Sequence, residues 1–259
     1  MAATLYLIPC PIADETAVAD VTPSANQHII DSLDYFIVEN TRSARRFLSK
    51  SGYAKAIDDA TFVELNEHTT NPTDIAKMIE PLLHGHSAGV ISEAGVPAVA
   101  DPGQAVVELC HRHNIRVVPL VGPSSILMSV MASGLSGQSF AFNGYLPIKE
   151  PERTKAIKKF ESRARAEHQS QLFIEAPYRN IKLFEQLLKT LQSDTRLCVA
   201  CDITAPTEYI RTATVATWRK EKSLPDIQKR PSIFILLYQN KHKKRAEIIV
   251  LPSFVFICT

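Results

Sequence analysis

Short apolar runs recur along the chain, and most are followed by a polar loop and a segment with apolar residues at helical spacing. Runs of about four to eight apolar residues between turn signals predict buried strands, and apolar positions three and four apart predict helices. Alternation of the two predicts an α/β fold, a parallel-rich sheet with helices on both faces. The predicted strands are residues 5–9, 35–39, 61–65, 88–92, 115–119, 140–144, 171–175, 196–201, 209–214 and 232–238.

Helix boundaries are marked by capping residues and by proline or glycine. A capping residue followed by proline at the first helical position is typical of a helix start. Glycine just past the last helical residue marks a helix end, as at Gly85 and Gly134. The predicted helix starts are Thr22-Pro23, Asn71-Pro72, Asp101-Pro102 and Gly122-Pro123.

The second half of the chain differs from the first. The residues between the strands at 209–214 and 232–238 are charged and show no long helical pattern, which predicts some antiparallel pairing. We therefore expect two α/β domains, at residues 1–120 and 121–240. Residues 241–259 form a basic and then apolar tail, expected to be a docked strand or a poorly ordered end.

Composition excludes several classes of protein. The chain has 259 residues, 45% of them hydrophobic, and a net charge of +2, which is typical of a globular protein. No apolar run approaches the roughly 20 residues of a membrane span, and the N-terminus lacks a basic signal region, so we expect a cytoplasmic protein. The five cysteines are spread along the chain, and Cys198 and Cys201 lie three apart in a strand, on opposite faces. We predict neither a disulfide framework nor a metal site.

Glycine is concentrated in one part of the chain. Seven of the nine glycines fall between Gly89 and Gly144. Residues 90–103 and 119–125 are turns of small residues that follow successive strands, where ligands bind in open α/β sheets. The patterns GxGxxG, GxxxxGK[ST] and GxSxG are absent, which argues against a dinucleotide fold, a P-loop and a hydrolase elbow. Two such turns in succession favour a nucleoside-like ligand.

Two basic clusters are candidates for binding phosphate. Arg42, Arg45 and Arg46 share one helix face, with no acidic partner on the following turn. Residues 149–165 carry seven basic and three acidic residues, so their net charge is 7 − 3 = +4. Contacts from such clusters to phosphates position nucleic acid without reading its sequence.

Several segments, in order, resemble one family of enzymes. They include IVENTRSARRFL, VISEAGVPAVADPG, VVPLVGPSSILMSVMASGL, FNGYLP and FIEAPYRN. Over residues 4–238 the chain resembles the tetrapyrrole methylase-like S-adenosylmethionine (SAM) methyltransferases, and within them the bacterial small-subunit rRNA (cytidine-2'-O)-methyltransferases. The resemblance implies two α/β domains with SAM in a cleft between them (a class III methyltransferase), usually as a homodimer. Tyr178 stands where the family's ESPHR segment has histidine.

The resemblance also implies site residues. Residues 92–99 and 122–125 are expected to line the SAM pocket, with one residue of the first loop and two of the second domain. The expected SAM-binding residues are Pro11, Ser92, Ala94, Gly95, Val96, Pro97, Val99, Gly122, Ser124, Ser125, Ala176 and Ile203. The expected substrate-binding residues are Glu39, Arg42, Arg45, Arg46, Lys149, Arg153 and Arg179.

The leading hypothesis is a SAM-dependent methyltransferase that methylates a ribose 2'-hydroxyl in small-subunit rRNA, with RNA as partner and no membrane. Removal of the hydroxyl proton needs a base, and Glu39, Glu93 and Glu175, at predicted strand ends, are equal candidates. One alternative is C-methylation of a tetrapyrrole by the same fold. Another is a SAM- or RNA-binding module without activity.

Overall fold

The computed structural model describes residues 3–66, 69 and 71–238, so the expectation for the tail at 241–259 lies outside the described residues. Contacts divide the chain into two compact units. Of the described residues, the first unit contains those up to Met128 together with Asp202–Glu208, and the second contains Ser129–Cys201 and Tyr209–Tyr238. All ten predicted strands are present, with ends within one residue of the predicted ones.

The first unit is built on a parallel sheet of five strands in the order β3-β2-β4-β1-β5. Its central strand β4 is buried along its whole length, which explains its continuous apolar sequence. The strands are β1 (Thr4–Ile8), β2 (Tyr35–Val38), β3 (Thr61–Glu64), β4 (Ala88–Ile91) and β5 (Arg116–Pro119).

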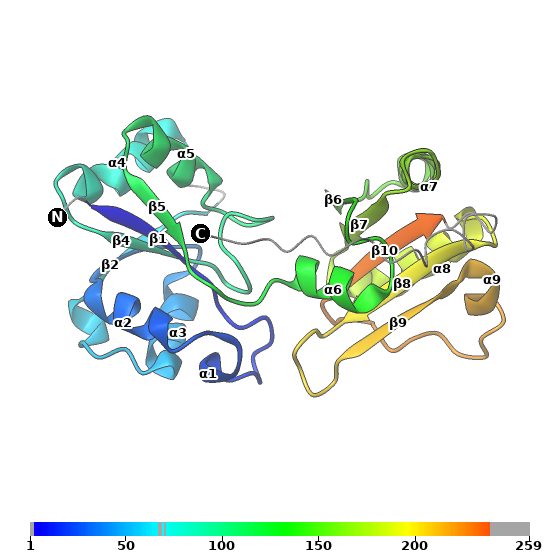
Figure 1. Cartoon of the computed structure of the whole chain (residues 1–259), viewed down its shortest axis with the longest axis horizontal. Helices are drawn as coiled ribbons and strands as arrows, with labels where there is room; N and C mark the ends of the chain where they lie inside the picture. Colours follow the sequence, from blue (N-terminus) through cyan, green and yellow to red (C-terminus); the bar gives the residue numbers. More distant parts are fainter. Residues whose placement is uncertain (1–2, 67–68, 70, 239–259) are drawn as a thin grey trace, which may run out of the picture. The chain divides into compact units, whose positions relative to one another are not determined.

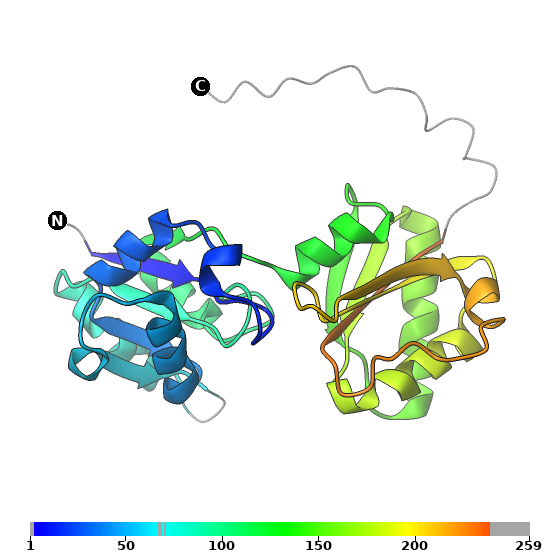
Figure 2. The ribbon, with the colours of Figure 1, turned by 90° about the horizontal axis from the view of Figure 1, so that it is seen from below.

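Helices cover both faces of this sheet, as predicted. In Figure 1 α4 and α5 lie on one face and α2 and α3 on the other, and Figure 2 shows the latter pair in front of the strands. One core contains Met78 and Val106 from the first pair, and the other contains Ile30 and Phe47 from the second. The helices are α1 (Val18–Val21), α2 (Ala25–Ser32), α3 (Thr41–Ser51), the 3-10 turn η1 (Ile57–Asp59), α4 (Pro72–Leu83) and α5 (Gln104–Arg112).

Only one of the four predicted helix starts is confirmed. Asn71 caps α4, because its side-chain oxygen accepts from the Asp74 amide at 2.9 Å. The start at Thr22-Pro23 is displaced by two residues: the Thr22 hydroxyl donates back to the Val18 carbonyl at 2.7 Å, and α2 begins at Ala25, after Ser24.

The other two predicted starts are displaced by two residues. At Asp101-Pro102 the chain instead turns through Gly103, whose φ of 124° is incompatible with a helix, so α5 begins at Gln104. After Gly122-Pro123, the hydroxyl of Ser124 accepts from the Leu127 amide at 3.4 Å, and the helix begins at Ser125. The two helix ends are as predicted: Gly85 and Gly134 follow α4 and α6 with φ of 90° and 62°.

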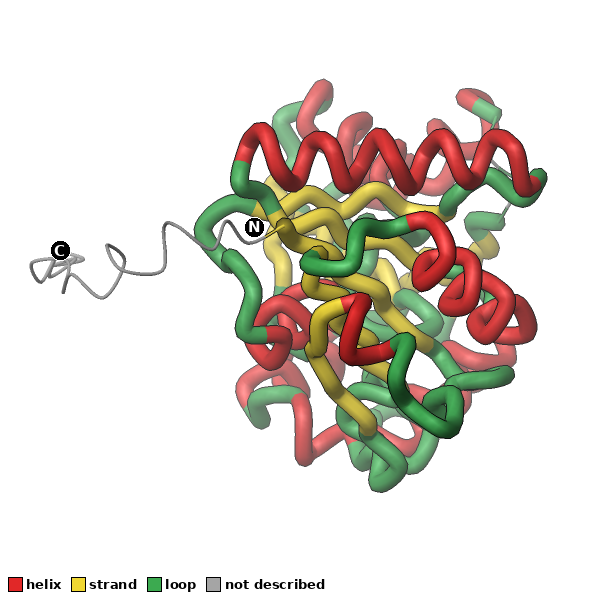
Figure 3. The backbone as a smooth tube through the Cα atoms, turned by 90° about the vertical axis from the view of Figure 1, so that its right-hand side faces the viewer, coloured by secondary structure: helices red, strands yellow, loops and turns green. Residues whose placement is uncertain are grey.

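The second unit has a mixed sheet in the order β6-β7-β10-β8-β9, as the irregular second half predicted. Strands β6 and β7 are parallel and the other neighbours are antiparallel. The long helix α7 lies along this sheet in Figure 3, and its Ile157 packs in one core with Phe173 and Phe234. The elements are α6 (Ser125–Ser133), which enters the unit, β6 (Phe140–Tyr145), α7 (Glu150–Glu167), β7 (Ser170–Ile174), η2 (Pro177–Arg179), α8 (Asn180–Thr190), β8 (Thr195–Cys201), β9 (Tyr209–Thr214), α9 (Val215–Trp218) and β10 (Ser232–Tyr238).

Candidate functional site

Two loops at the carboxyl edge of the first sheet are fastened to each other through their backbones. Cys10, after β1, and Gly95, after β4, exchange two hydrogen bonds, with N···O distances of 2.8 and 3.1 Å. The hydroxyl of Ser92 donates to the Gly95 carbonyl at 3.1 Å. The loop of residues 92–99 is therefore held in place without help from long side chains.

A third loop, after β5, packs closely on the first. A Cβ atom added at Gly122 would lie 2.2 Å from Cγ of Pro9, so no larger residue fits there. The side-chain amide of Asn26 donates to the Val121 carbonyl at 2.8 Å and anchors the same turn. Glycine is required at position 122 because the ring of Pro9 packs directly against its Cα atom.

The loop after β4 also has an unusual backbone. Gly95, Ala98, Ala100 and Gly103 have φ of 72°, 65°, 59° and 124°. Positive φ at two alanines is a strained arrangement of a kind that clusters at ligand sites. A Cβ atom at Gly95 would lie 3.5 Å from the Pro123 carbonyl oxygen, so a side chain there would fill the space between these loops. A cradle of backbone and small residues fits a nucleoside-containing cofactor such as SAM.

The structure places ten of the twelve predicted SAM-binding residues in these three loops of the first unit: Pro11, Ser92, Ala94, Gly95, Val96, Pro97, Val99, Gly122, Ser124 and Ser125. The placement of Ile203 in the second domain is wrong. Residues 202–208 pack with the first unit, where the Thr16 hydroxyl donates to the Thr204 carbonyl at 3.1 Å. Ala176 belongs to the second unit, directly after β7.

Carboxyl groups gather at the same edge of the first sheet. Glu39 follows β2, and together with Asp101 and Pro102 it lines a shallow hollow that is too small to hold a water molecule. Oδ2 of Asp101 is buried and has no hydrogen-bond partner among the described residues. Burial, then the neighbouring Glu39, then Glu93 raise the pKa of Asp101 to about 7. Asp101 is therefore able to bind and release a proton near neutral pH.

Asp101 is a candidate for a functional residue that the sequence analysis did not include, because there its pattern predicts a helix cap. Burial raises the pKa of the Cys10 thiol, and Asp101 and Glu93 add to this, so both carboxylates face the fastened loops. One sequence feature could have indicated Asp101. Glu39 follows β2, and Glu93 and Asp101 both lie in the loop after the adjacent strand β4. Their approach to one another depends on the strand order.

The basic stripe on α3 is only partly as expected. Arg45 pairs with Asp58 of η1, and Arg46 pairs with Asp14 of the first loop at 2.9 Å. The expectation of an uncompensated stripe is therefore wrong for these two, because their acidic partners come from other segments of the chain rather than from the next turn. Arg42 is exposed and forms no ion pair with a described residue.

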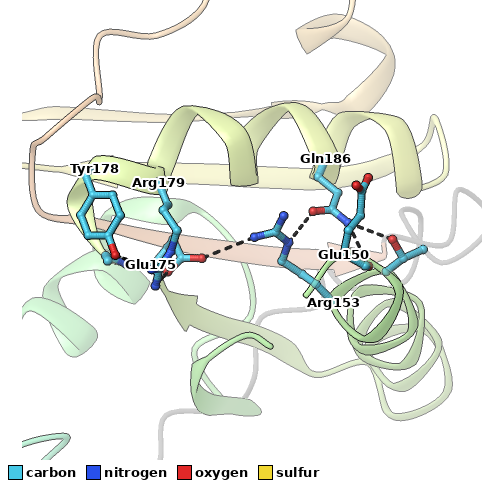
Figure 4. Close-up of polar contacts among 8 residues, drawn as sticks. Glu150, Arg153, Glu175, Tyr178, Arg179 and Gln186 are labelled. Carbon is cyan, nitrogen blue, oxygen red and sulfur yellow. Dashed lines mark hydrogen bonds and ion pairs between the residues drawn. The ribbon is translucent and has the colours of Figure 1, made fainter. Parts of the chain in front are cut away.

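Most charges of the second basic cluster lie on the surface of α7, but Arg153 is turned inward. Its side chain is 11% exposed, donates to the Gln186 side chain and lies 3.8 Å from Oε2 of Glu175 (Figure 4). Lys149 is exposed and precedes the first turn of α7. Arg163 pairs with Glu167 at 3.1 Å, and Arg165 lies over the ring of Tyr238. The cluster therefore contains arginines that contact other side chains of the protein and lysines, such as Lys149, that are exposed to solvent.

Glu175 holds a second arginine. Its side chain is fully buried, and its Oε1 accepts from Arg179 Nη2 at 2.6 Å and Nε at 2.9 Å. The Glu175 carboxylate is buried and engaged by both guanidinium groups and by the Ala176 amide, which removes Glu175 from the candidates for a base. Among the described residues, no group of three or more His, Cys, Asp or Glu is placed to hold a metal ion. No helix in the described part of the chain is long and apolar enough to cross a membrane.

Comparison with known proteins identifies the class. The family model "Tetrapyrrole (Corrin/Porphyrin) Methylases" matches residues 5–218, most of the chain. The solved structure titled "Crystal structure of the methyltransferase CobJ" shares the fold, with a TM-score of 0.58, 13% identity and coverage of 91% of this chain and 93% of its own. The chain belongs to the tetrapyrrole methylase family and is a SAM-dependent methyltransferase of the class III fold.

Two relatives with the same name give a more specific comparison within this family. The chain is 30% identical over 238 residues to "Ribosomal RNA small subunit methyltransferase I" of Vibrio cholerae, covering 90% of this chain and 76% of the relative. It is 31% identical over 211 residues to the protein of the same name from Mesorhizobium japonicum, covering 82% and 67%.

Proposed function

We propose that this enzyme transfers a methyl group from SAM to a ribose 2'-hydroxyl in small-subunit ribosomal RNA. The observation that carries the proposal is the similarity to rRNA small subunit methyltransferases over nine tenths of the chain. The arginines of the second unit support it, since phosphate groups are the commonest contacts that proteins make to nucleic acids.

The first unit supplies the cofactor site in this proposal. Residues 92–99 and 122–125, with Pro11 and Ile203, hold SAM mainly through backbone and small side chains. SAM supplies a methyl group that is already activated on sulfur. The fastened loops keep the site rigid, so that the acceptor oxygen can be held in line with the methyl carbon.

The acceptor hydroxyl must lose its proton as the new bond forms, and we propose Asp101 as the group that takes it. A base is most effective when its pKa lies near the working pH, and the pKa of Asp101 is raised to about 7 by burial and by Glu39 and Glu93. Glu39 lines the same hollow as Asp101.

The experiment is methyl transfer from labelled SAM to purified small ribosomal subunits, to protein-free rRNA and to a tetrapyrrole with carboxylate side chains. A 2'-O-methyl group blocks alkaline cleavage of the adjoining phosphodiester bond, so label is expected in alkali-resistant dinucleotides. Label in alkali-sensitive mononucleotides would contradict ribose methylation. Label only in the macrocycle would replace the RNA proposal with C-methylation, and bound SAM without any transfer would indicate an inactive module.

We further propose that the enzyme is a homodimer and acts in the cytoplasm. The resemblance to its family supports both statements. Light scattering during gel filtration tests the first, since a single peak with the mass of one chain would contradict it. Fractionation of the source cells tests the second.

A further inference from the structure

The second unit carries an exposed tyrosine at a break in its sheet. Strands β6 and β7 run parallel, and their pairing shifts between Phe142 and Tyr145, which faces Ile174. Gly144 supplies the turn, with φ of 64°. Such bulges redirect side chains. Here Tyr145 is 64% exposed whereas the next residue, Leu146, is 3% exposed and packs in the core.

A second exposed tyrosine follows the neighbouring strand. Tyr178 is 60% exposed, and the guanidinium of Arg179 lies 4.9 Å from its ring centre and donates to its hydroxyl at 2.6 Å (Figure 4). Tyr145 pairs with Ile174, the residue before Glu175, and the Glu175 carboxylate holds Arg179. Two exposed tyrosines and one guanidinium group therefore lie at the same end of β6 and β7.

This corner of the unit carries an excess of positive charge. Glu175 is the shared partner of Arg153 and Arg179, so the three groups sum to −1 + 1 + 1 = +1. Arginine has five N–H donors, and three of those on Arg179 are used by Glu175 and Tyr178. The other two have no acceptor among the described residues. A partly buried excess cation with free donors is completed by an anion.

We propose that Tyr145, Tyr178 and Arg179 form a binding site for a single-stranded segment of RNA, with bases stacked on the two rings and a phosphate on Arg179. The proposal rests on the proposed function and names how the RNA is held. Stacking on aromatic side chains beside arginine is how proteins bind unpaired nucleotides without reading their sequence. Double-stranded RNA does not offer its base faces, so the site selects unpaired RNA.

Glu175 is a positioning residue in this site. Its buried carboxylate accepts two hydrogen bonds from Arg179 and one from the Ala176 amide, at 2.7 Å, which fixes the guanidinium beside the Tyr178 ring. Its other oxygen, Oε2, has no hydrogen-bond partner in the described part of the chain and lies 3.8 Å from Arg153 Nη1. Glu175 touches no substrate in this arrangement and acts through the arginines.

The test measures binding of a fluorescent single-stranded RNA of about 12 nucleotides, a length within the usual range of such sites. Tyr145→Ala and Tyr178→Ala are each expected to weaken binding about tenfold, the usual effect of losing one stacked base. Tyr178→Phe keeps the ring and is expected to stay within about twofold of the unaltered protein. Lys189→Gln, which removes an exposed charge at the far end of α8 and outside both basic clusters, is the charge control and is expected to change nothing.

A second probe of the same length, with ribose and phosphate but no bases, separates stacking from charge. Its binding is expected to depend on Arg179 and not on the tyrosines. Equal loss of affinity for both probes in the tyrosine variants would overturn the stacking site. So would unchanged binding of normal RNA by folded Tyr145→Ala and Tyr178→Ala proteins. Unaltered protein that binds neither probe would instead contradict the proposed function.

The role of Glu175 is tested with Glu175→Gln, which keeps an acceptor and removes the charge. The KM for RNA is expected to rise about fivefold or more while kcat and SAM affinity stay unchanged, because only substrate binding depends on the arginine geometry. A variant that folds and shows an unchanged KM would contradict the positioning role. A fall in kcat and SAM affinity together with KM would show a general structural role instead.

Discussion

The loops after the strands of the first sheet present backbone, alanine, proline and carboxylate groups, whereas the end of β6 and β7 in the second unit presents arginine and tyrosine. In the first unit, Gly122 and Gly95 allow chains to approach within contact distance. In the second, Gly144 instead directs a large side chain outward. In the proposals above, glycine thus serves a cofactor contacted by backbone in one unit and an RNA strand contacted by side chains in the other. Four predictions test this division.

The largest effect is expected at Asp101. Asp101→Asn removes the proposed proton acceptor and is expected to lower the rate of methyl transfer by about 10²- to 10⁴-fold without changing RNA affinity. The rate of the unaltered enzyme, measured in single turnovers, is expected to rise with pH through about 7, where Asp101 loses its proton. A rate that is flat between pH 5.5 and about 8.5 would contradict the assignment.

Two further measurements accompany this prediction. Glu93→Gln removes a like charge, so it lowers the pKa of Asp101 and moves the rate profile to lower pH. Because the folded state raises this pKa, the stability contributed by the protonated group is present below about 3.8 and is lost as pH rises through about 7. At pH values above 7, Asp101→Asn is therefore expected to raise the melting temperature, because it removes a charged carboxylate whose burial destabilises the folded state.

The next effect is on SAM. Gly95→Leu places a side chain between the loops and is expected to weaken SAM binding by about 100-fold or more, measured by calorimetry. Gly85→Leu is the matched control, because Gly85 has a similar positive φ of 90° and open space around it. The Gly85→Leu protein is expected to lose as much stability as the Gly95→Leu protein and to bind SAM as tightly as the unaltered protein. Normal affinity in a folded Gly95→Leu protein would remove the cofactor from this loop.

A smaller effect compares the arginines of the two units. Arg179→Gln is expected to weaken binding of single-stranded RNA about tenfold and to flatten the log–log salt slope by about 0.7, the value of one phosphate contact. Arg45→Gln with Arg46→Gln is expected to flatten the slope less, because these guanidinium groups already have acidic partners. The opposite ranking in a salt titration would make α3 the principal RNA-binding surface.

The smallest effect concerns the bulge in β6. Gly144→Ala forces a left-handed φ on a residue with a side chain and is expected to lower the free energy of unfolding by about 1 kcal/mol. A Cβ atom added at Gly144 would have no neighbour within 4 Å, so backbone strain is the only cause of the expected loss of stability. Gly137→Ala, in ordinary backbone with a normal contact to Val130, is the control. Equal urea midpoints for the two variants would show that the bulge carries no strain.

Sequence patterns located the strands well, because a short apolar run such as Ala88–Ile91 is dictated by local burial alone. They failed where the answer depended on chain segments distant in sequence. The sequence pattern does not show that Asp58 and Asp14 pair with the arginines of α3. At Asp101 the following proline predicts a helix cap, whereas the carboxylates that surround it are brought there by the strand order. The small-residue loops were found because glycine is required wherever another part of the chain packs directly on the backbone, as the Pro9 ring does at Gly122.

The return of residues 202–208 to the first unit has a consequence for dissecting the enzyme. The chain passes between the units at Met128, at Cys201 and again at Glu208, so no single cut separates them. A fragment that begins at Ser129 would carry Ile203, only 4% exposed in the whole protein, away from the residues that bury it. Because residues 202–208 of the first unit interrupt the sequence of the second, a single recombination crossover cannot exchange either unit between genes.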